Sequence, residues 1–444
     1  MLTKHVKPLF TTFASDRRGN ISTVAALSLP VIVGFLGLGA ETASWYNGKR
    51  ALQNAADSAA IAAATNGDSL SYADEAKAVA ARYGYQDGVD GVTVAAVNNA
   101  PCPDGSNKCY AVTISQLKPM ILAQVTGYDG DGSINGSPAK MIAAKAVAIQ
   151  GLAPREYCVL ALASSGDPEA LRTNGAPKAD LSGCSVMSNS NATCNGHDLK
   201  ADYGDAFGTN NGCGKKKTSN VDKLADPYAG LTSNIPAQSC PSGYPVGPKK
   251  KHDPALPPEN VLGGTDTRSI LPMCGDVELS SDLTIAGGGA NGAVMLIRNG
   301  SLNLNGHTLK TQNGSALTII FTGDDNGRTH APIGKGTFDY QAPTTGPWKG
   351  VAMYQHPSLT GGVDIDGAGN EPTWTITGLV YLPKASVTFS GAVNKSSYGK
   401  SCFGLVVDNV TFNGTGSILA HGECDEAGLN LPKSDVPTRG ELVS

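Results

Sequence analysis

The sequence predicts an α+β protein in which a transmembrane helix and a small α/β module precede a mainly-β domain. Three observations support this fold class. No charged residue lies between Arg18 and Glu41, an alanine-rich stretch follows this run, and short β-prone segments recur from about Tyr157 onwards. At 444 residues, the chain has room for two or more domains after its first helix.

The uncharged run ISTVAALSLPVIVGFLGLGA is about twenty residues long, which lets one helix cross the hydrocarbon core of a bilayer. Pro30 lies inside the run, where a membrane helix accommodates proline more easily than a helix in water does. Four basic residues precede the run: Lys4, Lys7, Arg17 and Arg18. Behind it, Glu41 and Asp57 offset Lys49 and Arg50. The charge asymmetry therefore predicts a cytoplasmic segment at 1–20 and an exported remainder.

The apolar run lies late in the sequence, is long, and lacks a small-residue cleavage site directly after it. We therefore expect a retained anchor rather than a cleaved secretory signal. Good helix formers continue to residue 64, so residues 21–64 are predicted to form one transmembrane and alanine-rich helix, with Trp45 and Tyr46 at the membrane interface. A stripe of small residues at helical spacing is expected to pack against a neighbouring helix: Leu52, Ala55, Ala56, Ala59 and Ala63.

Residues 65–152 are predicted to form a small α/β module. Ser71 and Asp74 make a capping-box pattern for a second helix over Ser71–Tyr83. Alternating apolar residues predict strands in GVTVAAV, YAVTIS and KMIAAKAVAIQ, and a helical turn is expected near Leu117–Val125.

Residues 153–430 are predicted to form a β-rich domain, because short β-prone runs there are closed by glycine or Asn-Gly. This pattern permits a sandwich, a barrel or a solenoid. We favour a β-solenoid resembling a right-handed β-helix, because its narrow interior needs few aromatic residues and the chain has 6%. Alternation predicts four inward side chains: Trp374, Ile376, Val387 and Phe389. The proline-rich residues 240–264 are expected to form a long loop, and 431–444 a flexible tail.

All ten cysteines follow the apolar run, and none forms a CxxC pair. In an oxidising compartment they are expected to form disulfides, whose connectivity the sequence leaves open. Cys102 and Cys109 flank a short loop and are placed to staple a hairpin, whereas Cys402 and Cys424 bracket two strand-like runs. The competing interpretation is a zinc site, but no compact Cys/His spacing supports it.

Composition and motifs exclude several function classes. The formal net charge of −4 is small and there is no long basic block, so nucleic acid is a poor candidate partner. The triplets Lys215–Lys217 and Lys249–Lys251 are interpreted as solvated loops. The chain has no Walker loop, dinucleotide fingerprint, GxSxG elbow or HExxH pair, and its seven histidines are scattered. We therefore assign no catalytic, cofactor-binding or metal-ligating residue, and no cofactor.

The segment RRGNISTVAALSLPVIVGFLGLGAETASWYNGKRALQNAADSAAIAAA resembles the N-terminal domain of Tad-like (TadE/TadG-type) Flp pilus-assembly proteins. The shared features are an Arg-Gly before the apolar run, a proline within it, an acidic residue at its end, an aromatic pair and a QNAAD helix. Later runs such as CVLAL and ITGLVYLPKASVTFSG look like the β-rich extensions of some members.

The resemblance also raises the question of processing. Pseudopilin members of this group are cleaved after a glycine and carry a glutamate five residues later, whereas the fifth residue after Gly19 is Val24. We therefore expect an uncleaved anchor. The metal-binding von Willebrand module of longer relatives is not expected, because DGSIN at Asp131–Asn135 breaks its serine pattern and is typical of a glycine-rich turn.

The resemblance implies a non-enzymatic, membrane-anchored accessory or structural protein of Tad (Flp) tight-adherence pilus assembly, with a pilin-like N-terminal part. It would be a single-pass protein of the bacterial inner membrane with its bulk in the periplasm, and association with the cell surface is left open. Its expected partners are the membrane and other Tad pilus-assembly proteins. Polysaccharide or other envelope components are further candidate partners.

The alternative function is that of an exported β-helix protein that binds or cleaves carbohydrate. Two acidic pairs are the candidates for cation binding or acid–base work: Asp324 with Asp325, and Asp364 with Asp366. Asp364 and Asp366 are expected to face the same way, because residues i and i+2 on a strand do so. Four aromatic residues are the candidate sugar-stacking groups: Tyr340, Trp348, Tyr354 and Trp374. Packing in the core is the competing interpretation for each aromatic side chain.

Overall fold

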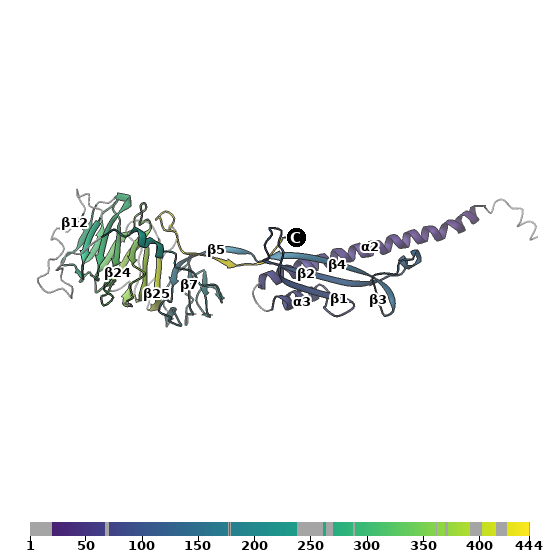
Figure 1. The fold of residues 1–444 in the computed structure, drawn as a ribbon, viewed down its shortest axis with the longest axis horizontal. Helices are drawn as coiled ribbons and strands as arrows, with labels where there is room; N and C mark the ends of the chain where they lie inside the picture. Colours follow the sequence, from purple (N-terminus) through teal and green to yellow (C-terminus); the bar gives the residue numbers. More distant parts are fainter. Residues whose placement is uncertain are drawn as a thin grey trace, which may run out of the picture. The chain divides into compact units, whose positions relative to one another are not determined.

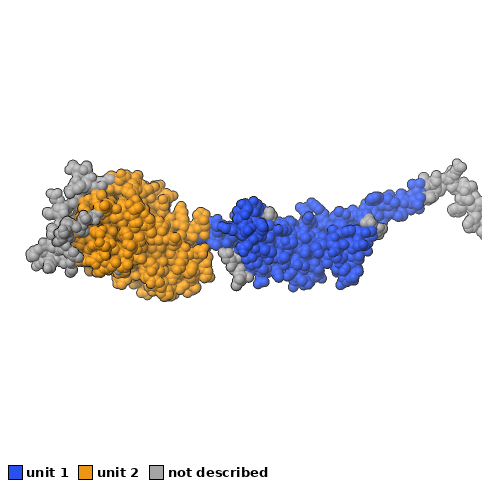
Figure 2. Space-filling model, viewed as in Figure 1, with its two compact units in different colours: residues 1–153, 436–444 blue, residues 154–435 orange. Residues whose placement is uncertain are grey.

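The structure is a computed structural model, and it confirms the α+β class through an N-terminal apolar helix and a large β-rich region. Two compact units are formed, one by residues 1–153 with 436–444 and the other by residues 154–435 (Figure 2). The residues that the structure describes are 20–66, 71–175, 177, 179–237, 261–262, 270–286, 289–360, 362–368, 372–390, 402–413 and 424–443.

Within the described residues, the first unit has the two α-helices α2 and α3 packed on an antiparallel sheet (Figure 1). The strand order is β1-β2-β4-β27, and β3 pairs with the other end of β4. The helix α2 continues through Pro30, as expected for this span. The elements are α2 (Asn20–Asn66), α3 (Tyr72–Arg82), β1 (Val92–Ala100), β2 (Cys109–Pro119), the 3-10 helix η2 (Ala123–Thr126), β3 (Gly132–Ile134), β4 (Ser137–Ile149) and β27 (Glu441–Leu442).

Alternation along the strands builds the core of this unit. Every second residue of β1, β2 and β4 points at the helices, so one face is apolar and the other is more exposed. The buried strand residues are Val92, Val94, Tyr110, Val112, Ile114, Ile142, Ala144, Ala146 and Ala148. They pack against buried alanines of α2 and α3.

Three local predictions for this unit need correction. α3 forms where expected, but the Ser71 side chain makes no cap hydrogen bond, so the capping box is absent. The helical turn expected near Leu117–Val125 begins only at Ala123, because β2 continues to Pro119 before η2 begins. The end of the chain is paired rather than free, since Glu441 and Leu442 lie in register with β4.

The second unit is built from parallel strand pairs stacked in ladders. The longest ladder is, in spatial order, β13 (Ile270–Cys274), β16 (Ala293–Arg298), β19 (Leu317–Thr322), β22 (Val351–Gln355), β24 (Thr373–Phe389), β25 (Phe403–Asn413), β5 (Leu152–Ala161), β7 (Ser185–Ser188), β9 (Tyr203–Ala206) and β11 (Lys216–Ser219).

Shorter ladders of parallel strands flank it. One contains β12 (Val261–Leu262), β15 (Leu283–Ile285), β18 (Thr308–Thr311), β21 (Thr337–Gln341) and the start of β24. A second contains β14 (Val277–Glu278), β17 (Leu302–Asn303) and β20 (Pro332–Ile333). A third contains β23 (Val363–Ala368), the ends of β24 and β25, β6 (Leu171–Asn174), β8 (Ala192–Thr193) and β10 (Asn210–Asn211). The remaining elements are η3 (Ala229–Asn234), η4 (Gly289–Asn291) and β26 (Lys433–Pro437).

The strand order in the long ladder departs from the order in the sequence. β5 pairs with β25, so Leu160 lies in register with Val406. From β5 the chain builds outward to β11, and strands β13 to β25 then fill the other side of β5. The first strand in the sequence, β5, therefore lies inside the ladder, with later strands added on both of its sides.

Side chains in register stack to form the core of the second unit. Leu296, Ile320, Tyr354 and Tyr381 succeed one another in neighbouring strands, and all four are fully buried. The alternation predicted inside β24 is confirmed, because four residues there are at most 2% exposed: Trp374, Ile376, Val387 and Phe389.

The expected staple between Cys102 and Cys109 is present, and Cys402 and Cys424, which bracket two strand-like runs, are joined to each other. The structure adds Cys158–Cys184 and Cys194–Cys213, and Cys274 is also disulfide-bonded. Within the described residues no cysteine is free.

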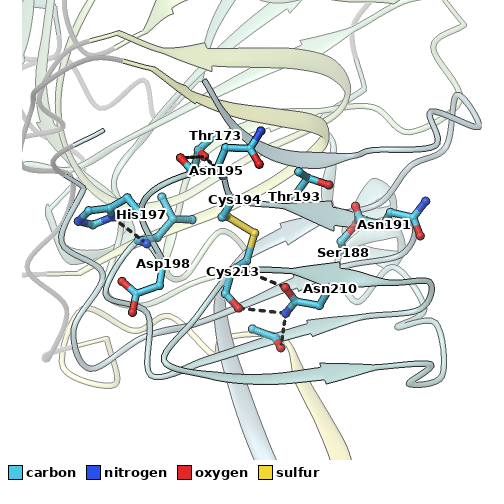
Figure 3. The surroundings of a disulfide bond; sticks show 12 residues. Thr173, Ser188, Asn191, Thr193, Cys194, Asn195, His197, Asp198, Asn210 and Cys213 are labelled. Atoms are coloured by element: carbon cyan, nitrogen blue, oxygen red, sulfur yellow. Dashed lines mark hydrogen bonds between the residues drawn. A yellow bond between two sulfur atoms is a disulfide. The ribbon is translucent and has the colours of Figure 1, made fainter. Parts of the chain in front are cut away.

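Figure 3 shows how the turn at Cys213 is fixed. The side-chain amide of Asn210 donates to the backbone oxygens of Gly204 and Cys213, at 2.7 and 3.0 Å, and its oxygen accepts from the Cys213 backbone N–H. Because Asn210 is 9% exposed, these bonds satisfy a nearly buried amide.

Candidate functional site

The helix α2 changes character along its length. Its first half exposes large apolar side chains, each at least 53% exposed: Val24, Leu27, Leu29, Val31, Ile32, Val33, Phe35 and Leu36. Among the described residues, α2 is the one helix that is long and apolar enough to cross a membrane, judged by length and composition. An apolar surface of this size needs a cover, and the length of the uncharged run matches a bilayer.

The second half of α2 is covered by its own unit. The predicted stripe is fully buried in the first unit's core: Leu52, Ala55, Ala56, Ala59 and Ala63. The expectation that this stripe packs against a neighbouring helix is confirmed within the chain, because the buried alanines Ala76 and Ala80 of α3 lie in the same core. Small side chains are needed there because the sheet and α3 approach the helix closely.

Glu41 lies where the two halves of α2 meet, and it binds the backbone of the segment that follows β2. Its carboxylate accepts three backbone hydrogen bonds, from the N–H groups of Ile121 and Ala123 at 2.8 Å and of Leu122 at 3.1 Å. These residues belong to the connection between β2 and β3. Sequence reasoning treated Glu41 only as an offsetting charge and a family feature. Glu41 is the first charged residue after the uncharged run, and this position is the sequence feature that could have indicated specific hydrogen-bond donors for its carboxylate.

The two predicted interfacial aromatics differ in environment. Trp45 is partly buried and packs against the core of the first unit. Tyr46 is 63% exposed, and the guanidinium carbon of Arg50 lies 6.0 Å from its ring centroid. Of the two aromatic residues, Tyr46 is therefore the one whose ring is exposed and able to contact a membrane interface.

Processing of the N-terminus stays a prediction. Val24, the residue at the position of a pseudopilin glutamate, is 65% exposed on α2. Gly19 lies outside the described residues.

Asp131 of the DGSIN segment makes bonds within the protein, accepting from the Tyr128 hydroxyl at 2.6 Å and from Lys140 at 2.9 Å.

The candidate sugar-stacking aromatics are all in the core. None of the four is more than 2% exposed: Tyr340, Trp348, Tyr354 and Trp374. Their rings pack against one another and against other aromatics, as in the stacked pair of Tyr354 with Tyr381 at 4.8 Å between centroids. Since a sugar needs an open ring face, the suggestion that these side chains stack on carbohydrate is wrong.

The acidic pairs lie at the surface of the second unit. Asp364 and Asp366 are both exposed on the same face of β23, as the i, i+2 spacing predicts. Asp324 accepts from Arg298 at 3.1 Å, and Asp325 lies 3.4 Å from Nε of Arg328. No group of three or more potential metal ligands occurs within the described parts of the chain.

The lysine triplet at Lys215–Lys217 is exposed, as expected, but it leads into β11 rather than forming a loop. Lys215 donates to Asp202 at 3.1 Å, and Lys216 lies 4.9 Å from the ring centroid of Tyr203. The triplet Lys249–Lys251 and most of residues 240–264 lie outside the described residues.

A cavity of about 320 Å³ opens in the second unit, with Ser164, Asp226 and Lys384 in its lining. The Ser164 hydroxyl donates to Asp408 at 2.6 Å, and Asp226 accepts from the Tyr381 hydroxyl at 2.6 Å. Ser164 and Asp226 therefore both make hydrogen bonds within the protein at the wall of this cavity.

Comparison with known proteins gives one result. Residues 19–66 match the family model of TadE/G-like Flp pilus-assembly proteins, named Tad. The match covers the whole of α2 and the residue before it, and it confirms the resemblance that the sequence suggested. Searches of curated proteins and of solved structures found no significant match.

Proposed function

We propose, from the Tad-like domain at residues 19–66, that this chain is a non-enzymatic accessory or structural protein of Tad (Flp) pilus assembly. It is anchored in the inner membrane by the first half of α2, with its N-terminus in the cytoplasm. The two β-containing units are then displayed in the periplasm, where the second unit is available to envelope or surface components.

This proposal is supported by one observation: the residues that match the family are those of α2, whose first half is exposed and apolar and whose second half is buried. The matched segment begins in a run of exposed apolar side chains and ends in a half that its own sheet buries. A helix divided in this way fits an anchor with a folded unit built directly on it. The Tad family is associated with pilus assembly rather than with catalysis, which supports a structural role.

The disulfides support export of the two units. Four pairs join cysteines in the described residues, and each unit contains at least one. Disulfides persist in the bacterial periplasm and are rare in the cytosol, so the compartment outside the inner membrane is favoured.

For the second unit we propose a β-solenoid, with the domain limits close to residues 153 and 430. Its support is the succession of parallel pairs through residues in register, such as Leu296, Ile320 and Tyr354. Stacked parallel coils connected by glycine-containing turns have this pairing pattern.

Deletion and complementation test the proposed function. Deletion of the gene is expected to reduce piliation and surface attachment, and the wild-type chain is expected to restore both. A chain in which an unrelated apolar helix of equal length replaces residues 21–40 is the matched control for anchorage alone. Unchanged piliation and attachment after deletion would refute the role in assembly.

Protease accessibility tests the orientation. In spheroplasts, the second unit is expected to be digested while an N-terminal tag remains protected, and both are expected to survive in intact cells. Protection of the second unit in spheroplasts would contradict export.

A further inference from the structure

We propose that the connection after β2 is a second membrane contact, which inserts its apolar tip into the lipid leaflet beside α2. The proposal rests on the proposed anchoring of α2. We call residues 120–131, which lie between β2 and β3, the β2–β3 connection. The partner that this connection contacts is the lipid bilayer, in the leaflet on the side of the folded units.

The composition of residues 120–128 of the connection is that of a membrane-contacting loop. No charged residue lies between Lys118 and Asp129. At its tip Ile121 is 78% exposed and Leu122 is 36% exposed. The transfer of adjacent large apolar side chains from water to lipid is favourable, because it removes apolar surface from water.

The connection is fixed to α2 at the level where the uncharged run ends. Glu41, the first charged residue after that run, accepts the three backbone N–H groups of the tip. One turn earlier, Gly37 leaves the space that the Leu122 side chain fills, since a side-chain carbon at Gly37 would overlap Leu122. At about 1.5 Å per residue, Gly37 lies roughly 4–5 Å inside the end of the run at Ala40. Leu122 therefore meets α2 at the edge of the hydrocarbon region.

The bonds to Glu41 solve the main difficulty of placing a loop at this depth. Unpaired backbone N–H groups are costly where water is scarce, and irregular backbone is tolerated near lipid only when its polar groups are satisfied. Three such groups are satisfied here by one carboxylate, which is in turn satisfied by three donors. This mutual pairing lowers the cost of placing the loop at the edge of the lipid.

Photocrosslinking to lipid tests the contact. A diazirine-bearing amino acid is placed singly at residue 121, 35 or 97 of the full-length chain, in liposomes of phosphatidylethanolamine and phosphatidylglycerol. Phe35 is 72% exposed in the apolar half of α2 and reports on the anchor. Val97 is 54% exposed and pairs with Ala111, which lies ten residues before Ile121 and so roughly 30 Å away along the strand direction. Residue 97 is therefore the matched exposed control.

We expect the yield of lipid adduct at residue 121 to approach that at residue 35 and to exceed that at residue 97 severalfold. Adduct at 35 with none above control at 121 would overturn this proposal and leave the anchor intact. No adduct at 35 would overturn the anchor. Crosslinking of residue 121 to a second protein chain instead of lipid would also overturn the proposal.

A second variant tests the role of Glu41. Glu41→Ala in the chain with the probe at residue 121 is expected to lower its lipid adduct severalfold while the adduct at residue 35 stays unchanged. Thr42→Ala is the control, because the Thr42 hydroxyl donates to the backbone oxygen of Leu38 in its own helix, at 2.7 Å. An unchanged yield at residue 121 in the Glu41→Ala chain would show that this carboxylate does not position the tip.

Discussion

Arg155 donates from one terminal nitrogen to both carboxylate oxygens of Asp205, at 2.6 and 2.5 Å, and Asp205 is only 1% exposed. The Tyr157 hydroxyl completes the site at 2.7 Å, and burial together with the adjacent Asp205 charge raises the pKa of Tyr157. We predict that Arg155→Met lowers the free energy of unfolding by about 3 kcal/mol, because it leaves a buried carboxylate without its cation. Denaturant unfolding of the full-length chain in detergent measures this loss.

The double variant Arg155→Met, Asp205→Asn is the control for this pair. It removes the charge together with its partner, so part of the loss is expected to be recovered. A loss below about 0.5 kcal/mol in the single variant would place the pair among exposed ion pairs and contradict the interpretation.

Gly214 and Gly166 provide a matched test of close packing between coils. Both have a φ of about +80°, but a side-chain carbon at Gly214 would overlap the backbone of Gly204, whereas Gly166 faces open space. Gly166→Ala is therefore expected to cost about 1 kcal/mol through backbone strain alone. Gly214→Ala adds an overlap of about 1–3 kcal/mol. Equal unfolding midpoints for the two variants would contradict this packing.

Features set by spacing along the chain could be predicted from the sequence. The staple between Cys102 and Cys109 followed from their short separation, and the inward positions of Trp374 and Phe389 followed from alternation. The start of the Tad-like domain was recognisable for the same reason, because its pattern is continuous.

Features set by long-range pairing could not be predicted. All five residues of β22 are buried, so Tyr354 has no alternation to reveal which way it faces. The register of Leu160 with Val406 and the pairing of Leu442 with β4 join segments that are remote in sequence. At the junction on α2, sequence placed Glu41 correctly at the end of the apolar run, but its partners depend on where β2 ends.

The Asp131 carboxylate makes the first unit sensitive to acid. Bonds from the Tyr128 hydroxyl, Lys140 and the Met141 backbone lower the pKa of Asp131 from 3.8 to about 2. Because the folded pKa is depressed, the stabilisation is present above pH 3.8 and is lost as the pH falls towards about 2. Over that interval Asp131→Asn should lose less stability than the wild type. Unfolding midpoints in urea as a function of pH measure the difference.

Asp129→Asn is the comparison for this pH test, because it removes a neighbouring carboxylate while leaving the bonds of Asp131 in place. It should keep the wild-type dependence on pH over this interval. If Asp131→Asn shows that same dependence, the bonds to Tyr128 and Lys140 do not contribute the expected acid sensitivity.

The alanine stripe of α2 can be tested by comparing a buried with an exposed alanine on the same helix. Ala59 is fully buried and Ala51 is exposed. Leucine and alanine both favour helices, so a change to leucine at either position tests space rather than helix propensity. Ala59→Leu is expected to lower the free energy of unfolding of the first unit by about 1–3 kcal/mol through overpacking, whereas Ala51→Leu is expected to be nearly neutral. Denaturant unfolding followed by circular dichroism measures both. If the stripe instead served association with another helix, Ala59→Leu would weaken that association and leave unfolding unchanged.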